Sequence, residues 1–251
     1  MHSINNYTTL AFSFVMGLSI FLSMPLVLKR NIKSKTIILF NAIAIGILVF
    51  LLMDIYGDVA AIFGTSTIFK SGAEVVFIAA FAISFMFFIF PKASRDPSEN
   101  PKRTSILAAF GIGLQNLTEG LVFGSAGAAG LGSIWLISLI GFTLQNVTEG
   151  FPIATPLLGS AERIKKRFIT GAFLIGGVPT IIGTVIGIMY YSQMFIVFFD
   201  SLASAAIVYV VLVLFHMNLK KAMSDDVKRV MLVTYFGILI GFVIAFAVNY
   251  I

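Results

Sequence analysis

Eight long apolar segments follow one another along this chain of 251 residues. A helix needs about 20 apolar residues to cross roughly 30 Å of hydrocarbon. Hydrophobic residues make up 59% of the sequence and charged residues only 11%, against about 25% charged residues in a soluble domain. The pattern predicts an all-α, polytopic membrane protein with one transmembrane domain over residues 1–251. The expected spans are residues 7–28, 36–56, 72–90, 104–124, 133–156, 168–191, 194–217 and 230–250.

The basic residues predict the orientation of these spans. The connections after the first, third, fifth and seventh segments hold 16 of the 17 Lys and Arg residues, and only Lys70 falls on the other side. Because such residues are retained on the cytoplasmic side, we expect these connections in the cytoplasm and both termini outside. The net charge of +6 is therefore attributed to topology in a plasma (cytoplasmic) membrane, and a nucleic-acid partner is not expected.

One signature occurs twice, in the fourth and fifth segments. Residues 114–120 read LQNLTEG and residues 144–150 read LQNVTEG. An acid in hydrocarbon costs about 2.5–3.5 kcal/mol on insertion scales, so it usually marks a transport path or a binding site. Gln115 and Gln145 lie about 16 and 18 Å from opposite ends of their segments, near the membrane midplane. The short connection at 125–132, rich in Gly and Ala, predicts that these antiparallel helices pack closely.

The polar side chains of each copy share one helix face, because Gln and Glu are four residues apart and Asn and Glu three. Two such faces turned toward each other would surround a divalent cation with carboxylate and amide oxygens. The alternative is that the amides only hydrogen-bond one helix to the other, which explains one copy but does not require an acid in both. The predicted metal ligands are Gln115, Asn116, Glu119, Gln145, Asn146 and Glu149.

Four further residues are candidates for the path of the ion. Asp54 and Asp58, near the outer end of the second segment, would draw cations into an outer vestibule, although placement at the interface explains them nearly as well. Asp200, about six residues into the seventh segment, is a better candidate for the access path. His216, at the cytoplasmic end of that segment, is a candidate for metal exit, but a lone interfacial His is more often incidental.

The paired signature in the fourth and fifth of eight spans resembles the ZIP (Zrt/Irt-like) divalent-metal transporters, prokaryotic GufA-like branch. Residues 40–48, 203–211 and 237–242 are similar to the second, seventh and eighth helices of that family. The resemblance implies a binuclear metal centre between the fourth and fifth helices, a homodimer, and transport into the cytoplasm. The first metal would take the glutamines and glutamates of both copies. The second would take the two asparagines, with the same glutamates bridging.

Three positions depart from the family pattern. Gln115 stands where the family usually has His, Asn146 where many members have Asp, and Thr180 where the sixth helix often has Glu. This correspondence makes Thr180 a fifth candidate for the path of the ion. These departures predict a weak or absent second site. The chain also has no cysteine, which excludes thiolate ligands. The resemblance favours Zn²⁺ as the transported ion, and an all-oxygen site would also accept Mn²⁺, Fe²⁺ or Cd²⁺.

These features together predict a transporter of a divalent transition metal that works by alternating access. An enzyme is not expected, because the sequence contains no HExxH, no GxSxG and no cysteine. The alternative function is a metal-gated cation channel or a membrane metal sensor that uses the same site. Saturable transport would favour a carrier, whereas linear, high flux would favour a channel.

Overall fold

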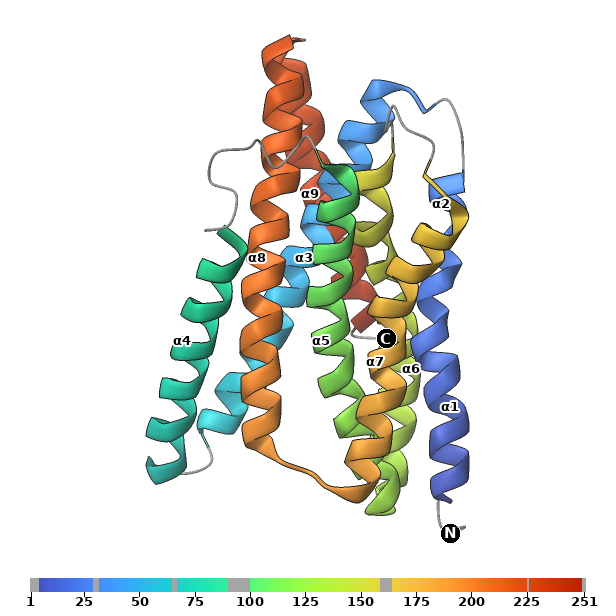
Figure 1. Cartoon of the computed structure of the whole chain (residues 1–251), viewed down its shortest axis with the longest axis vertical. Coiled ribbons are helices and arrows are strands. Elements are labelled where there is room, and N and C mark those ends of the chain that lie inside the picture. The colour runs from blue at the N-terminus through green and yellow to red at the C-terminus, as the bar shows by residue number, and fades with distance from the viewer. Residues whose placement is uncertain are drawn as a thin grey trace.

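A computed structural model describes residues 5–28, 32–64, 67–89, 100–158, 164–224 and 226–249 (Figure 1). Every regular element in these ranges is a helix, so the predicted all-α fold is confirmed for them. The elements are α1 (Asn6–Ser19), η1 (Ile20–Ser23), α2 (Pro25–Leu28), α3 (Ser34–Phe63), α4 (Thr67–Ile89), α5 (Pro101–Ala128), α6 (Gly132–Ala154), η4 (Thr155–Leu157), α7 (Lys166–Met189), α8 (Gln193–Ser224) and α9 (Val227–Asn249).

The described residues contain six helical stretches that are long and apolar enough to cross a membrane. They are Asn6–Val27, Ser34–Phe63, Pro101–Ala128, Lys166–Met189, Gln193–Met223 and Val227–Asn249. The apolar part of α4, Gly72–Phe88, is shorter, and α6 carries the second polar signature. The chain is therefore a helical protein suited to cross a membrane several times, and eight spans stay a prediction.

Several helix boundaries differ from the predicted spans. α3 continues to Phe63, so Asp54 and Asp58 lie inside the helix and not at its end. The first span is one stretch in the prediction but three short helices in the structure, because Pro25 has no N–H to continue the hydrogen-bond ladder. The predicted proline-rich connector at 91–99 lies outside the described residues.

α5 begins at Pro101 for a local reason. The side chain of Asn100 accepts a hydrogen bond from the Arg103 backbone N–H at 3.0 Å and so caps the helix. Proline suits the first helical position, where its missing N–H is not needed. Because the helix starts here, it is 28 residues long, and Gln115 lies at its middle.

The helices form two groups that lie side by side (Figure 1). α1, α5, α6 and α7 contact one another, and we call them the site bundle because both signatures lie in it. α3, α4, α8 and α9 contact one another and form the flanking bundle. The two bundles meet where α8 packs on α5 and where α6 packs on α3 and α9.

Glycines bring helix backbones together inside each bundle. A Cβ on Gly120 would collide with the Thr180 carbonyl of α7, and one on Gly183 with the Leu117 carbonyl of α5. A Cβ on Gly46 of α3 would likewise collide with a backbone carbonyl of α9. Between the bundles, by contrast, a Cβ on Gly111 would first meet the side chain of Ala206, at 2.9 Å. Glycines therefore allow several close backbone contacts within each bundle, and this contact between the bundles is made through a small side chain.

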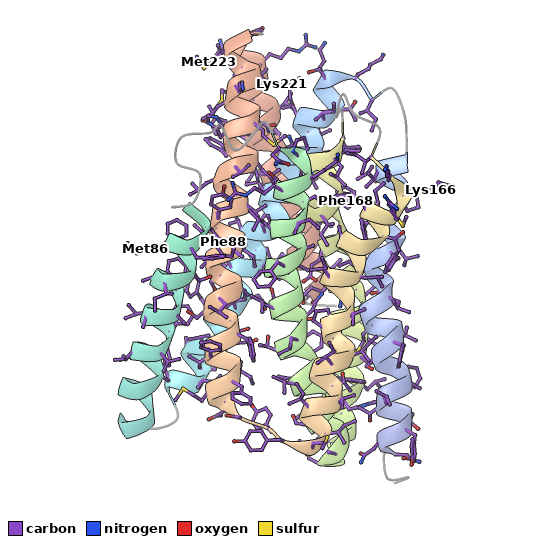
Figure 2. The ribbon with its side chains drawn as sticks, in the orientation of Figure 1. Met86, Phe88, Lys166, Phe168, Lys221 and Met223 are labelled. Atoms are coloured by element: carbon purple, nitrogen blue, oxygen red, sulfur yellow. The ribbon has the colours of Figure 1, made fainter. Side chains whose placement is uncertain are left out.

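The described basic residues of the four predicted cytoplasmic connections gather at one end of the molecule, which we call the basic end. Lys166 begins α7 and Lys221 lies in the last turn of α8, and both lie at this end (Figure 2). α3, α5 and α9 also begin there (Figure 1). The side of the membrane that this end faces stays a prediction. Lys29, Arg30, Lys92, Arg95 and Arg163 lie outside the described residues.

Candidate metal centre

The two signatures meet inside the site bundle. α5 and α6 are joined by a tight turn in which Gly130 has a φ of 68°, a left-handed conformation that glycine adopts without strain. The turn makes the two helices antiparallel and brings their polar faces together. Asn116 Nδ2 lies 2.7 Å from Asn146 Oδ1, and Gln145 Nε2 lies 2.8 Å from Glu119 Oε1. The expected juxtaposition of the two copies is therefore present.

The predicted close packing of α5 is present, but its main partner differs from the prediction. α5 packs most extensively on α7, and less on α6. Gly120 and Gly124, which we expected to serve close packing, contact α7 backbone. α5 and α6 are instead held together across the site by polar side chains.

Amide groups hold both carboxylates. Gln145 Nε2 donates to Glu119 Oε1 at 2.8 Å and to Glu149 Oε1 at 3.2 Å, so it bridges the two acids. Gln115 Nε2 also donates to Glu119 Oε1, at 3.1 Å. Each glutamate thus has one oxygen in hydrogen bonds and one oxygen, Oε2, without a hydrogen-bond partner.

The backbone determines which way the two asparagine amides point. Asn146 Nδ2 donates to the Phe142 carbonyl at 3.0 Å, so Asn146 Oδ1 faces Asn116 and accepts from Asn116 Nδ2. Asn116 Nδ2 also donates to the carbonyl of Gly176 in α7, at 2.9 Å. Because carbonyl oxygens only accept, neither amide can be reversed without losing a hydrogen bond. Asn116 Oδ1 is therefore left without a donor.

Five oxygen atoms of this constellation are buried without any hydrogen-bond partner. Leaving a buried acceptor unsatisfied costs about 1–3 kcal/mol, so folded proteins seldom do so. Five unsatisfied acceptors on two facing helices, with two acids among them, are a set of atoms that a cation would satisfy. The atoms are Gln115 Oε1, Asn116 Oδ1, Glu119 Oε2, Gln145 Oε1 and Glu149 Oε2.

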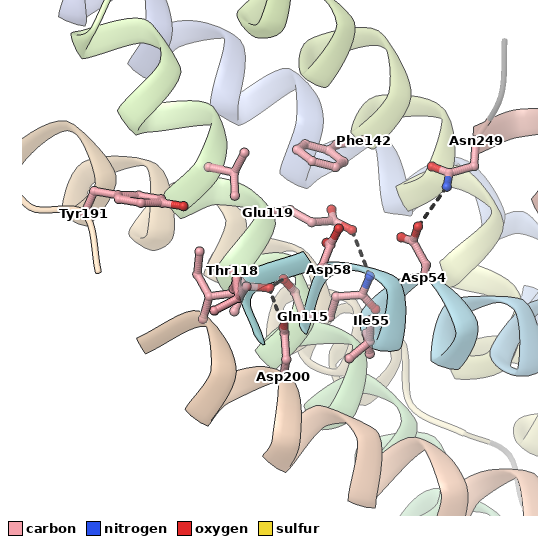
Figure 3. Close-up of a pocket in the computed structure, with 13 residues that line it drawn as sticks. Asp54, Ile55, Asp58, Gln115, Thr118, Glu119, Phe142, Tyr191, Asp200 and Asn249 are labelled. Atoms are coloured by element: carbon pink, nitrogen blue, oxygen red, sulfur yellow. Dashed lines mark hydrogen bonds between the residues drawn. The ribbon is translucent and has the colours of Figure 1, made fainter. Parts of the chain in front are cut away.

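A cavity of about 250 Å³ leads to this constellation (Figure 3). On α5 its lining runs from Gln115 to Val122, and on α8 from Asp200 to Ile196, which in both helices is the direction away from the basic end. Glu119 is 6% exposed, whereas Glu149 is 0% exposed. The cavity therefore reaches the site from the end opposite the basic end, and it reaches the α5 copy first.

Three aspartates of the flanking bundle line the same cavity (Figure 3). Asp200 is buried and accepts a hydrogen bond from the Thr118 hydroxyl at 2.8 Å. Asp54 is half-buried and accepts one from Asn249 Nδ2 at 3.0 Å. Asp58 is exposed. No Lys, Arg or His is among the described lining residues, so every charged side chain among them is acidic.

The other two pathway candidates have different positions. Thr180 in α7 is fully buried, and its hydroxyl has no hydrogen-bond partner. It packs on α5 at Gly120, the residue after Glu119. His216 is exposed on α8, and its 16-residue separation from Asp200 corresponds to about 24 Å of helix toward the basic end. His216 is therefore not brought to the site.

The described residues contain no group of three His, Cys, Asp or Glu side chains that would hold a metal ion. What the chain offers is two carboxylates supplemented by amide oxygens. Oxygen ligands of both kinds bind hard divalent cations. The cation would therefore be held by a mixed carboxylate and amide shell.

Four polar or aromatic residues of the cavity lining were not among the predicted site residues. Thr118 lies inside the first signature, and its position beside Glu119 was the available signal. Tyr191 follows the end of α7, and partial burial, and then the charge of Asp58, raise the pKa of its phenol. Asn249 and Phe142 carry no sequence signal, because only the packing of α9 and α6 brings them here.

A scan against protein-family models finds no match to this chain, and a search of curated proteins finds none either. What the fold and the site define is a class: a helical, multi-pass membrane protein with a buried, acidic, oxygen-lined site. The likeness to ZIP transporters rests on the signature residues.

Proposed function

We propose that this protein is a transporter that carries a divalent metal cation into the cytoplasm through the site formed by the two signatures. The observation that carries the proposal is the set of five buried oxygen atoms without partners. Two carboxylates supply the charge that a divalent cation requires, and the ion would in turn relieve the cost of burying them. The amide oxygens complete its shell.

The acidic cavity supports the same function. An ion arriving from the end opposite the basic end passes Asp58 and Asp54 before it reaches Glu119. Carboxylates without a basic neighbour concentrate cations in such a funnel. The cavity thus provides an access path that matches the charge of the proposed cargo.

The two-bundle architecture favours a carrier over a channel. The site is built on α5, α6 and α7, whereas most of the acids that line its access come from the flanking bundle. Movement of the site bundle along α3 and α8 would close the outer path and open another, which is alternating access. A metal-gated channel or a metal sensor with the same site is the alternative.

The resemblance favours Zn²⁺ as the cargo, with Mn²⁺, Fe²⁺ and Cd²⁺ as the alternatives. It also favours a homodimer in the plasma membrane. A second metal, held by Asn116 and Asn146 with the glutamates bridging, would have to share Asn146 Oδ1 with the hydrogen bond from Asn116.

The test is cation influx into liposomes that contain a metal-sensitive dye. Glu119→Gln and Glu149→Gln keep the shape of the side chains but remove one charge each, so we expect each to lower influx at least tenfold. Asp226→Asn is the matched control, because it makes the same change at an exposed position of the basic end. Equal influx in the wild type and both glutamine variants would show that the signatures only join the helices.

A further inference from the structure

The chemistry of the donor atoms restricts which divalent cation the site accepts. All five unpartnered acceptors are oxygen atoms, two from carboxylates and three from amides. Soft cations gain most from thiolate, thioether and imidazole ligands, whereas Mg²⁺ and Mn²⁺ prefer carboxylate, carbonyl and water oxygens. No Met or His is among the described lining residues of the cavity, and the chain has no Cys.

The amide groups cannot supply nitrogen in place of oxygen. The nitrogen of a side-chain amide is a hydrogen-bond donor and does not serve as a ligand for a cation. The nitrogens of Gln115, Asn116 and Gln145 are moreover all engaged as donors, to carboxylates, to Asn146 Oδ1 and to the Gly176 carbonyl. The shell presented to the ion therefore stays all-oxygen.

The number of ligands points to the same class of ion. Zn²⁺ sites in proteins are mostly four-coordinate and tetrahedral. Octahedral, six-coordinate oxygen shells are typical of Mg²⁺ and Mn²⁺. Five protein oxygens with one water from the cavity would complete six positions. Mg²⁺ gives up its water reluctantly, so a site that replaces most of the hydration shell suits Mn²⁺ better.

We infer that the transported ion is a hard, six-coordinate divalent cation of the Mn²⁺ type, selected over Zn²⁺ and Cd²⁺ by the all-oxygen shell. This inference rests on the proposed transport function and specifies its cargo. It differs from the Zn²⁺ expectation because Gln115 brings an oxygen to the position where an imidazole would favour a softer metal.

The experiment compares influx of Mn²⁺, Mg²⁺, Zn²⁺ and Cd²⁺ into liposomes for the wild type and for Gln115→His. We expect kcat/KM of the wild type for Mn²⁺ to be above that for Zn²⁺, Cd²⁺ and Mg²⁺. In Gln115→His the ratio of Zn²⁺ to Mn²⁺ should rise at least tenfold. Tyr7→His is the matched control, since it adds an imidazole at an exposed position of α1 and should leave the ranking unchanged.

A second measurement reads the ligand shell directly. Pulsed electron paramagnetic resonance of bound Mn²⁺ detects nitrogen atoms coordinated to the metal. We expect no such coupling in the wild-type protein in detergent and a clear coupling in Gln115→His. If Gln115→His does not fold, Gln145→His places the imidazole on the other helix of the same site.

The outcomes separate the two proposals. No influx of any divalent cation would overturn the transport function itself. Influx with Zn²⁺ or Cd²⁺ preferred to Mn²⁺, or nitrogen coupling in the wild type, would overturn only the Mn²⁺ assignment. An unchanged ranking in a folded histidine variant would also overturn it, because the glutamine would then lie outside the shell.

Discussion

At the scale of single residues, Asn116 has the most connected position in the site. It donates to Asn146 and to the Gly176 carbonyl, and so joins α5 to both α6 and α7. Its remaining oxygen is one of the five buried oxygens without a hydrogen-bond partner, which the proposed function assigns to the ion. A single amide therefore positions the two signature helices against a third helix and also offers a ligand.

Replacing Asn116 by Leu tests this role. The variant leaves Asn146 Oδ1 buried without a donor and removes the second hydrogen bond to the Gly176 carbonyl, so we expect the free energy of unfolding to fall by about 1–3 kcal/mol and influx to decrease. Thermal unfolding in detergent measures the first effect. Ser125→Ala on the same helix removes only a local, partly exposed hydrogen bond and should stay within about 0.5 kcal/mol of the wild type. Equal stability of Asn116→Leu and Ser125→Ala would contradict the assignment.

The sequence predicts the residues that share a helix face, but not all the residues that meet there. Spacings of three and four placed Gln115, Asn116 and Glu119 together, and the structure agrees. The contacts Thr118–Asp200 and Asp54–Asn249 join positions 82 and 195 residues apart. No local periodicity contains such pairs, since the first depends on how the two bundles pack and the second on how α3 and α9 pack within one bundle.

At the scale of the helices, α5 and α7 form the tightest pair of the site bundle. Gly120, Gly124, Gly183 and Gly187 each lie against a backbone carbonyl of the other helix. The sequence contains these glycines but does not indicate which helix they pack against. The short connection made α6 the expected partner of α5, yet α6 presents polar groups to α5 and α7 presents small residues.

Gly183→Ala tests the importance of this close approach. Its Cβ would overlap the Leu117 carbonyl, so α5 and α7 would have to separate, and we expect lower stability and at least tenfold lower influx. Gly171→Ala, in the same helix, meets nothing within 4 Å and should be neutral or slightly stabilising. Melting temperatures and influx of the two variants decide the matter. A fully active Gly183→Ala protein would show that the helix pair tolerates separation.

At the scale of the whole molecule, one contact between the two bundles is made by small groups. A Cβ on Gly111 of α5 would first meet the side chain of Ala206 in α8, at 2.9 Å. A contact between small side chains can shift without breaking backbone hydrogen bonds. The membership of each bundle was not visible in the sequence, because it depends on contacts between segments far apart in the chain.

A disulfide across the interface tests whether the bundles move. The chain has no native cysteine, so Gly111→Cys with Ala206→Cys introduces a single pair of thiols. The Cβ atoms at these two positions lie close together, so a disulfide can form between the introduced cysteines. We expect oxidation to abolish influx and reduction to restore it. Ala42→Cys with Gly237→Cys, inside the flanking bundle, should leave influx unchanged by oxidation. Full influx through the oxidised interface pair would instead favour the channel alternative.

The unequal exposure of the two glutamates gives the site a direction. Glu119 borders the cavity, whereas Glu149 is fully buried and is joined to Glu119 through Gln145. A cation that enters through the cavity would thus meet two chemically identical carboxylates in a fixed order, Glu119 first and Glu149 second. Gln145 Nε2 donates to both acids, and the oxygen of the same amide has no hydrogen-bond partner. An ion held by Glu119 and Gln145 Oε1 would therefore act on the residue that also holds Glu149, so this one amide would link the two carboxylates during binding.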